Sequence, residues 1–418
     1  CIMSATTKKL DYADVPPRAS SSRSLRTEVV PSNGNSFNMN NTIIFDLPSN
    51  VSNTFWDAQS SYVRLNFTNG DAAAVNFEGG GFPTCIRRVE MLLGGQTLCS
   101  IDSYNVLYQM MLDLDTSGQF RTNAGARLFG AANSAVGEQV AAAGVRQVCF
   151  PLALTPIIQS SKYWPLFGRE PLRIRIELDT SARGLKGAAT DAEITIDEVA
   201  LVMYQLELGN DVMSQVASNS GGMMRIAMPS YQHHQATLGA GATSVAATLG
   251  YSMSSLNRIL VAQRLSAVTA ANVTIGNRSQ CNLTQCNVKI GGVQYPQIAV
   301  KDRQDQGAEV LAEALVSQRA LLSYGHDSSL ELGAGFVANE PTGADNDNTG
   351  HFLIELDLES QRVDAGSLVA GVNCIGQVVQ FESTYDAGVT AAHVLDIFGE
   401  HTIMAQLDLQ SLTWSIAV

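Results

Sequence analysis

Charged residues, long apolar runs and closely spaced cysteines are all scarce in this sequence. Asp, Glu, Lys and Arg make up only 16% of the 418 residues, whereas hydrophobic residues make up 45%. This composition excludes an intrinsically disordered chain, and the length predicts about two domains with a large core. No apolar run reaches the roughly 18 residues of a membrane-spanning helix, and the first residues lack the hydrophobic stretch of a secretory signal. We therefore expect a folded protein that neither spans a membrane nor is secreted.

Cysteine is present only as seven scattered residues, an odd number without a dense framework. Small secreted proteins that depend on disulfides space their cysteines closely, and this chain does not. We expect reduced, mostly buried thiols. The seven residues are Cys1, Cys85, Cys99, Cys149, Cys281, Cys286 and Cys374.

Basic residues are few and unevenly placed. The formal net charge is -13, yet residues 1–39 hold five basic and three acidic residues, a net charge of +2 that leaves -15 on the remainder. An acidic body excludes a protein whose main work is to wrap nucleic acid, because phosphate binding needs a clustered basic face. Only this N-terminal arm is expected to touch DNA or lipid headgroups, although a solvated, mobile terminus explains it equally well. Its basic residues are Lys8, Lys9, Arg18, Arg23 and Arg26.

Common catalytic and metal-binding motifs are missing. The sequence has no P-loop, no H-E-x-x-H, no G-x-S-x-G and no complete G-x-G-x-x-G pattern. Cys281 and Cys286 could form half of a zinc site, but no second Cys or His pair lies at a fitting distance, so two ordinary thiols or a local disulfide are expected. His233 and His234 are neighbours in an alternating stretch and should point to opposite faces. Asp345–Gly350 imitates the start of a calcium loop without its later glutamate. We expect no catalytic residue, cofactor or metal.

Short alternating segments bounded by Gly, Asn, Asp and Pro dominate the chain and predict β-strands. In Leu172–Asp179 every second side chain is apolar, so one face of the strand can be buried. The expected strands of the first half are Thr42–Leu47, Ser61–Thr68, Ile86–Leu93, Val145–Leu152, Leu172–Asp179 and Ile194–Leu208. Those of the second half are Arg225–Leu238, Ser255–Val268, Cys286–Tyr295, His351–Glu359, Gly376–Glu382, Val394–Phe398 and His401–Val418.

Only two segments have the periodicity of a helix. In Ser103–Leu114 and in Gln306–Leu322 the apolar residues fall on one helical stripe. Between the two halves, Gly209–Met224 is rich in Gly, Ser and Asn, which predicts a linker with room for one helical turn. The sequence thus divides into an arm (1–39), a first β unit (40–208), the linker (209–224) and a second β unit (225–418).

The two halves repeat the same order of parts. Gly94-Gly95 and Gly291-Gly292 each separate two short strands, which predicts type I′ hairpins because both central positions need positive φ. A helix follows each hairpin. Three matches in the same order predict two β-sandwiches that are built alike, with a helix beside each. The other two matches are Ile176–Asp179 with Ile354–Asp357, and Gln205–Leu208 with Gln406–Leu409.

Several passages, spread over nearly the whole chain, carry a resemblance to a known family. Pro31–Phe37 leads into Ile43–Pro48 at the start of the first unit. Tyr163–Gly168, followed by Pro171–Ile174, is the most specific passage, and Val288–Pro296 looks like the matching hairpin of the second unit. In these passages the chain resembles double jelly-roll major capsid proteins, the lineage of adenovirus hexon, tailless membrane-containing phages, virophages and Polinton-like viruses.

The resemblance implies an all-β fold of two tandem jelly rolls, each with a short helix beside it, and an extended N-terminal arm. It implies a homotrimer, in which three chains form a nearly six-fold capsomer that tiles the icosahedral shell of a DNA virus. Its partners would be neighbouring capsomers, a penton protein at the vertices and minor capsid proteins. The arm would face the interior of the virion, near the genome or an internal membrane. Such a protein is structural, not an enzyme.

Two other hypotheses stay open at this stage. A jelly-roll carbohydrate- or receptor-binding protein, such as a viral spike or a lectin, would use aromatic residues exposed in its loops. A jelly-roll enzyme such as a cupin would need His and carboxylate ligands on neighbouring strands. The six histidines of this chain are too dispersed for that cluster.

Overall fold

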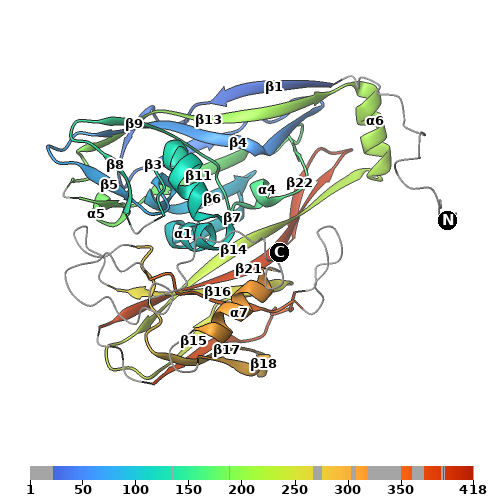
Figure 1. The fold of residues 1–418 in the computed structure, drawn as a ribbon. Helices are drawn as coiled ribbons and strands as arrows, with labels where there is room; N and C mark the ends of the chain where they lie inside the picture. Colours follow the sequence, from blue (N-terminus) through green and yellow to red (C-terminus); the bar gives the residue numbers. More distant parts are fainter. Residues whose placement is uncertain are drawn as a thin grey trace, which may run out of the picture.

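The chain forms two β-sandwiches stacked one on the other (Figure 1). The fold expected from the sequence, two tandem jelly rolls, is confirmed. The computed structural model describes residues 22–133, 136–187, 189–266, 275–302, 307–318, 350–359, 371–386, 389 and 391–417.

The first sandwich contains eight main strands in two sheets. One sheet has the order β1-β13-β4-β9, and the other has the order β3-β11-β6-β7. Counted from one to eight along the chain, the strands therefore run 1-8-3-6 and 2-7-4-5, the order of a jelly roll. The strands are β1 (Ser22–Val29), β3 (Thr42–Asp46), β4 (Thr54–Asn69), β6 (Ile86–Leu93), β7 (Gln96–Asp102), β9 (Val145–Phe150), β11 (Leu172–Leu178) and β13 (Ile194–Leu208).

Short strands extend these sheets at their margins. β2 (Ser36–Asn38) pairs with β13, and β10 (Trp164–Pro165) pairs with β4. A small separate sheet has the order β12-β5-β8. Its strands are β12 (Leu185–Lys186), β5 (Val75–Glu78) and β8 (Val136–Val140).

The second sandwich repeats the topology of the first. Its sheets have the orders β14-β21-β16-β19 and β15-β20-β17-β18, which are again 1-8-3-6 and 2-7-4-5. A final strand, β22 (Trp414–Ala417), pairs with β21. The strands are β14 (Met223–Leu238), β15 (Ser244–Leu249), β16 (Leu256–Leu265), β17 (Leu283–Ile290), β18 (Val293–Lys301), β19 (Ile354–Asp357), β20 (Val379–Tyr385) and β21 (His393–Asp408).

Alternation of apolar and polar residues explains why these strands form. In β11, Leu172, Ile174 and Ile176 are buried, whereas Arg173 and Arg175 between them face outward. A strand with one apolar face is stable only when that face packs on a second layer, and here the layer is the other sheet of the sandwich. The predicted ranges of β6 and β13 agree with the structure at both ends.

Helices lie at the predicted places, with one addition. The predicted helices are present as α1 (Tyr104–Asp115) and α7 (Ala308–Ser317). The linker was expected to hold one turn, but it contains the ten-residue helix α6 (Asn210–Asn219). Its first turn carries Asp211, a favourable charge at a helix N-terminus. The remaining short helices are η2 (Phe82–Cys85), α2 (Gly118–Phe120), η3 (Arg121–Gly125), α3 (Ala126–Phe129), α4 (Pro156–Gln159) and α5 (Ser181–Gly184).

Several strand predictions differ from the structure. Val394–Phe398 and His401–Val418 were expected as separate strands, but β21 runs unbroken from His393 to Asp408 and is followed by the separate strand β22. Gly399, which lies between the two predicted strands, is part of β21, and a Cβ there would lie only 2.7 Å from the ring of Tyr251. In addition, Ser22–Val29 was expected within the arm, but the structure shows it as β1, an edge strand that is hydrogen-bonded to β13.

Both predicted hairpin turns have positive φ at their central glycines. Gly94 and Gly95 have φ of 56° and 88°, and Gly291 and Gly292 have φ of 56° and 84°. These values are typical of the type I′ turn, which matches the twist of the strands that it joins. The turns therefore fix the register of β6 with β7 and of β17 with β18.

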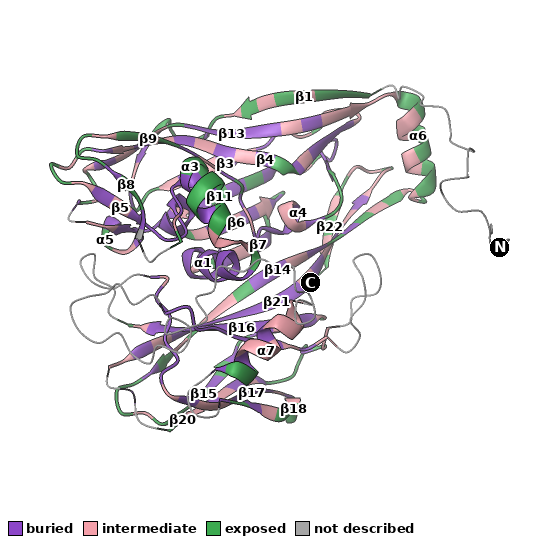
Figure 2. Ribbon diagram, in the orientation of Figure 1, coloured by how far each residue is buried: buried purple, intermediate pink, exposed green. Residues whose placement is uncertain are grey.

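The four main sheets lie in successive layers. In Figure 1 the sheet with β1, β13 and β4 is the top layer, β14, β21 and β16 cross the middle, and β15, β17 and β18 lie at the bottom. Helix α1 lies where the two sandwiches meet, and Figure 2 shows that it is buried along its length. The second sandwich therefore presents one sheet to the first and keeps the other outside.

A glycine comparison tests the hairpin geometry. Gly292 and Gly239 both have open space where a Cβ would lie, but only Gly292 has positive φ. We expect Gly292→Ala to lower the free energy of unfolding by about 1–2 kcal/mol, because an L residue is strained in that conformation. Gly239→Ala, the control, should change it by less than about 0.5 kcal/mol or stabilise slightly. Guanidinium denaturation followed by circular dichroism measures both, and equal midpoints would contradict the turn assignment.

Candidate assembly surfaces

The seam between the two sandwiches is apolar at its centre. Strand β7 of the first sandwich lies along β14 of the second. Ile226 and Met228 on β14, Leu260 on β16, and Phe398 and Ile403 on β21 belong to the same hydrophobic cluster as the core of the first sandwich. One core therefore continues across the seam, and the two sandwiches bury each other's surface.

A buried carboxylate joins the sandwiches at the end of helix α1. Arg278, from the second sandwich, donates from Nη2 to Asp113 Oδ2 at 2.5 Å and from Nε to the carbonyl of Phe352 at 3.0 Å. Arg121, just beyond α1, forms an ion pair with the other carboxylate oxygen, to which Gln109 donates at 3.1 Å. Both guanidinium groups are fully buried. Asp113 thus pairs with two guanidinium groups, one from each sandwich.

The surroundings of Asp113 keep it ionised. Burial by itself raises the pKa of this carboxyl, because an ion is poorly solvated in the interior. The positive charges of Arg121 and Arg278, and the neighbouring His351, outweigh burial and hold the pKa below its ordinary value. The cluster is therefore charged at neutral pH and depends on close pairing.

Further ion pairs brace the sheet of the second sandwich that faces the seam. Asp396 on β21 accepts from Arg264 Nε at 2.5 Å, and its other oxygen lies 2.9 Å from His233 Nε2. Burial raises the pKa of Asp396, but the hydrogen bond to His233 and the charge of Arg264 bring it below the ordinary value. Arg258 on β16 reaches Glu400 at 2.5 Å and Glu355 at 2.7 Å. His233 is therefore a structural partner of a carboxylate.

The last strand ties the second sandwich back to the first. Trp414 on β22 stacks on Trp164 of β10, with ring centroids 4.3 Å apart and planes at 5°. Its backbone N–H donates to Glu170 at 3.1 Å, and Gly168 leaves room for its ring, since a Cβ there would lie 2.3 Å from the indole nitrogen. This contact joins the far ends of the two sandwiches.

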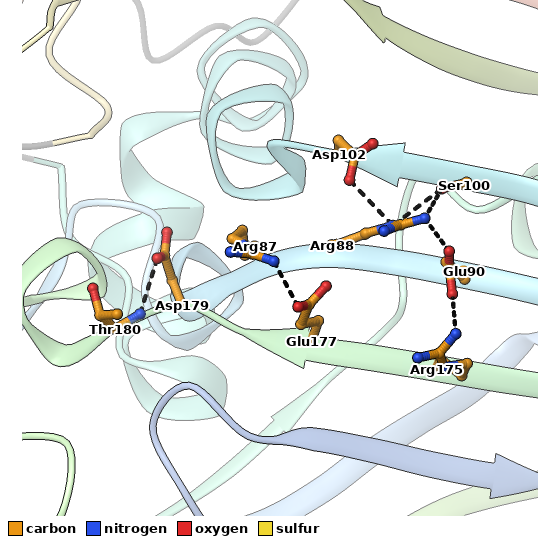
Figure 3. A network of polar contacts seen from close by, with 9 residues as sticks. All are labelled: Arg87, Arg88, Glu90, Ser100, Asp102, Arg175, Glu177, Asp179 and Thr180. Carbon is orange, nitrogen blue, oxygen red and sulfur yellow. Dashed lines mark hydrogen bonds and ion pairs between the residues drawn. The ribbon is translucent and has the colours of Figure 1, made fainter.

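The outward face of β6, β7 and β11 carries a charged network (Figure 3). Arg88 pairs with Glu90 and lies 3.1 Å from Asp102, while Arg175 reaches the other oxygen of Glu90 at 2.7 Å. Arg87 pairs with Glu177 at 2.6 Å. Arg87, Asp102 and Arg175 are exposed, and the other three side chains are half-buried, so solvent screens these pairs and each contributes little to stability. The face is typical of a solvated surface.

The predicted arm residues are only partly described. Lys8, Lys9 and Arg18 lie outside the described residues. Arg23 lies on β1 and forms an ion pair with Glu207 at 2.9 Å. Arg26, also on β1, donates to Glu28 at 3.3 Å and to the hydroxyl of Tyr62 at 3.5 Å. Their contact with a genome or a membrane stays a prediction.

The six described cysteines are present as thiols, including Cys281 and Cys286. The local disulfide that the sequence left open is therefore not formed. Burial raises the pKa of the Cys85 thiol, and it raises those of Cys99 and Cys286 to about 12. Such thiols react slowly at neutral pH, since the thiolate is the reactive form.

Within the described ranges, no three His, Cys, Asp or Glu side chains are grouped as metal ligands would be. The calcium-like segment Asp345–Gly350 lies outside the described residues except for Gly350. In the part of the chain that the structure describes, no helix has the length and apolar character needed to cross a bilayer.

Sequence reasoning missed the residues that join the sandwiches. Asp113, Arg121 and Arg278 were not singled out, although one signal was present. In residues 104–114 every side chain is uncharged except Asp113. A single charge within an apolar helix indicates a buried ion pair, because unpaired charges are almost never buried.

Solved structures match this chain over almost its whole length. It is similar to VP54 of PBCV-1, as fitted into a reconstruction of the virophage Sputnik, with 12% identity, a TM-score of 0.62, and coverage of 97% of this chain and 99% of VP54. For the Faustovirus major capsid protein the identity is 11%, the TM-score 0.58 and the coverage 94% and 92%. For the Sputnik virophage structure the identity is 11% and the TM-score 0.56, with coverage of 100% of this chain and 93% of the virophage chain.

No family model matches the sequence, and neither does any curated protein. At identities of 11–12% the likeness to solved structures concerns the fold. It confirms the double jelly roll that the sequence resemblance implied.

Removing the buried carboxylate tests the seam. We expect Asp113→Asn to lower the free energy of unfolding by about 3–5 kcal/mol, because it leaves two buried guanidinium groups without their counter-ion. Asp46→Asn is the matched control, since Asp46 pairs with Arg173 at 2.6 Å on the exposed surface and should cost about 0–1 kcal/mol. Guanidinium denaturation measures both. Equal losses in the two variants would show that the cluster does not hold the seam.

The Asp113→Asn variant also predicts how the stability of the protein depends on pH. Because the pKa of Asp113 is lowered in the folded protein, its contribution is complete above the pKa of the unfolded chain and is lost as pH falls through the folded-state pKa. The stability difference between the wild type and Asp113→Asn should therefore stay constant from neutral pH to about 4, and shrink below that. Unfolding free energies measured over this range check it. A difference that already shrinks above about pH 5 would contradict the ionised cluster.

Proposed function

We propose that this chain is the major capsid protein of an icosahedral DNA virus, a structural subunit of the virion shell without an active site. One observation carries the proposal: two jelly rolls of identical strand order are joined rigidly in one chain by a buried seam. The solved structures that share this arrangement over nearly their whole length include the major capsid protein of Faustovirus.

The fold suits a hexagonal tile. Two similar sandwiches side by side give one chain two of six nearly equivalent sides, so three chains complete the ring. We therefore propose a homotrimeric capsomer that contacts neighbouring capsomers through its outer faces. A different protein would fill the five-fold vertices, and minor capsid proteins would join the shell.

The domain limits of the subunit are part of the proposal. Because β1 and β2 belong to a sheet of the first jelly roll and β14 begins at Met223, we assign residues 22–208 and 223–418 to the two jelly rolls, 209–222 to the linker and 1–21 to the arm. The arm would face the capsid interior, where its basic residues could meet a genome or an internal membrane.

A structural role also accounts for the buried charges. Asp113 and Asp396 are each held by an arginine and by a second donor. Such pairs fix geometry, whereas catalytic groups need access to a substrate. The described buried carboxylates thus support a rigid subunit.

Mass and shape of the purified full chain test the proposal. Size-exclusion chromatography with light scattering should give a particle of three chains, because the closed ring satisfies every subunit equally. Negative-stain electron microscopy should show six-sided capsomers or shells. A chain that stays monomeric at all concentrations and salt conditions, and never forms particles, would overturn the proposal.

A further inference from the structure

A cavity lies where helix α6 passes from the first sandwich to the second. Its volume of about 490 Å³ falls in the range of about 300–1,000 Å³ that is typical of small-molecule sites. The walls come from β4, β10 and β13 of the first sandwich, from α6, and from β14 of the second. Figure 1 shows α6 at one end of the molecule, next to the ends of β13 and β14. The cavity is therefore built from both sandwiches and from the linker between them.

The inner part of the cavity is apolar. Phe55 on β4 and Ile226 on β14 line it with buried side chains. Leu206 and Leu208 on β13 and Val216 on α6 also line it and are only half-buried. An apolar occupant would remove the remaining apolar area of these side chains, and its own, from water. The walls thus favour a hydrocarbon over a polar ligand.

The mouth of the cavity is basic. Lys162, Tyr163 and Arg225 line it with exposed side chains. None of the described lining residues is acidic, and neither Lys162 nor Arg225 forms an ion pair with a carboxylate in the described ranges. The chain as a whole has a net charge of -13, so two unneutralised cations at one mouth are unusual for this surface. They complement a negative charge held beside them.

The walls can adjust to a chain-like ligand. Met223 and Met224 line the cavity, and methionine is unbranched and has three rotatable bonds, so it fills irregular gaps. Helix α6 has no fully buried residue, so a small shift of this wall would cost little packing. The cavity is thus suited to a flexible hydrocarbon chain more than to a rigid ring system.

We infer that the cavity binds one fatty-acid anion, with its hydrocarbon chain between α6 and the two sandwiches and its carboxylate beside Lys162 and Arg225. At roughly 30 Å³ for a methylene group, about the volume of a water molecule in the liquid, 490 Å³ corresponds to about 16 carbon atoms. That is room for one chain, but not for the two chains of a phospholipid. The inference goes beyond the proposed function, because a shell subunit needs no ligand to tile.

Residues 1–21 of the chain are the competing occupant. Strand β1 begins at Ser22, which pairs with Leu208 at the cavity wall, so the preceding segment starts within reach. Charge disfavours it: residues 1–21 contain three basic and two acidic residues, and a net positive segment would meet Lys162 and Arg225. A fatty-acid anion has both the apolar chain and the charge of the required sign.

Calorimetric titration of the full chain with dodecanoate, below its micelle concentration, tests the inference. We expect one saturable site per chain. The Kd of decanoate should be about 15-fold higher, because each buried methylene group changes the affinity about fourfold. Dodecyltrimethylammonium has the same hydrocarbon chain with a cationic head group. It should bind more weakly than dodecanoate, because Lys162 and Arg225 repel it.

Matched variants place the ligand in the cavity. Val216→Trp should abolish dodecanoate binding, because the indole fills the space between α6 and β13. Val212→Trp is its control, since Val212 is half-buried on the same helix and does not line the cavity. It should bind as the wild type does. Circular dichroism verifies the fold, and Leu208→Trp replaces Val216→Trp if the latter is unfolded.

A second pair of variants tests the basic mouth. Arg225→Gln should raise the Kd of dodecanoate by up to about fivefold, the effect of an exposed ion pair, and should lower that of dodecyltrimethylammonium. Arg169→Gln is the control, since Arg169 is exposed and does not line the cavity. It should change neither value.

The outcomes separate the inference from the proposed function. No saturable binding of dodecanoate by the full chain, which a cavity filled by residues 1–21 would also give, overturns the inference. So does binding that Val216→Trp leaves intact, or equal affinity for the anionic and the cationic probe. Binding to phosphatidylglycerol vesicles without binding to dodecanoate would mean that this end meets a bilayer, and it also overturns the inference. None of these results changes the number of chains in the particle, so the shell function stands or falls by its own test.

Discussion

The relative orientation of the two sandwiches depends on one buried carboxylate, Asp113, held between a guanidinium group from each side. Apolar packing alone is not directional, so the hydrophobic centre of the seam would tolerate some sliding of one sheet over the other. Buried ion pairs tolerate very little sliding, because a displaced pair no longer offsets the cost of removing its charges from water. The Trp164–Trp414 stack fixes the opposite end. Together these contacts make one rigid body out of two sandwiches, which a subunit needs if it is to fill two sides of a regular ring.

Much of the fold could be predicted because its causes are local. Alternation in Leu172–Asp179 and the paired glycines at the hairpins act over a few residues, and the structure confirms both. Strand β1 was missed because it lies on a sheet edge with most of its side chains exposed, so its pattern resembles a polar arm. Its hydrogen-bond partner, β13, lies more than a hundred residues further along the chain. Helix α6 was underestimated for a similar reason: it buries none of its side chains, and its composition is that of a linker.

The residues at the seam could be predicted only in part. Asp113 is conspicuous in an otherwise uncharged helix, and burial of such a charge requires a cation. Nothing local identifies that cation, since Arg278 lies 165 residues away in a stretch between strands. The packing of the two sandwiches brings Asp113 and Arg278 together, and this packing cannot be predicted from the local sequence around either residue. The repeated order of the strands could be predicted from the sequence. The difference in burial between α1 and α7 could not, because it depends on how the two sandwiches pack against each helix.

The state of the cysteines has a consequence for the covalent stability of the protein. None of the described thiols is part of a crosslink, and burial suppresses the thiolate form at Cys85, Cys99 and Cys286. Thiol–disulfide exchange needs a thiolate with access to its target, so these sites are inert toward glutathione in either oxidation state. The packing around these three thiols is therefore indifferent to redox conditions. In a particle built from this chain, these three sites would stay as thiols in a reducing cell interior and in oxidising surroundings outside.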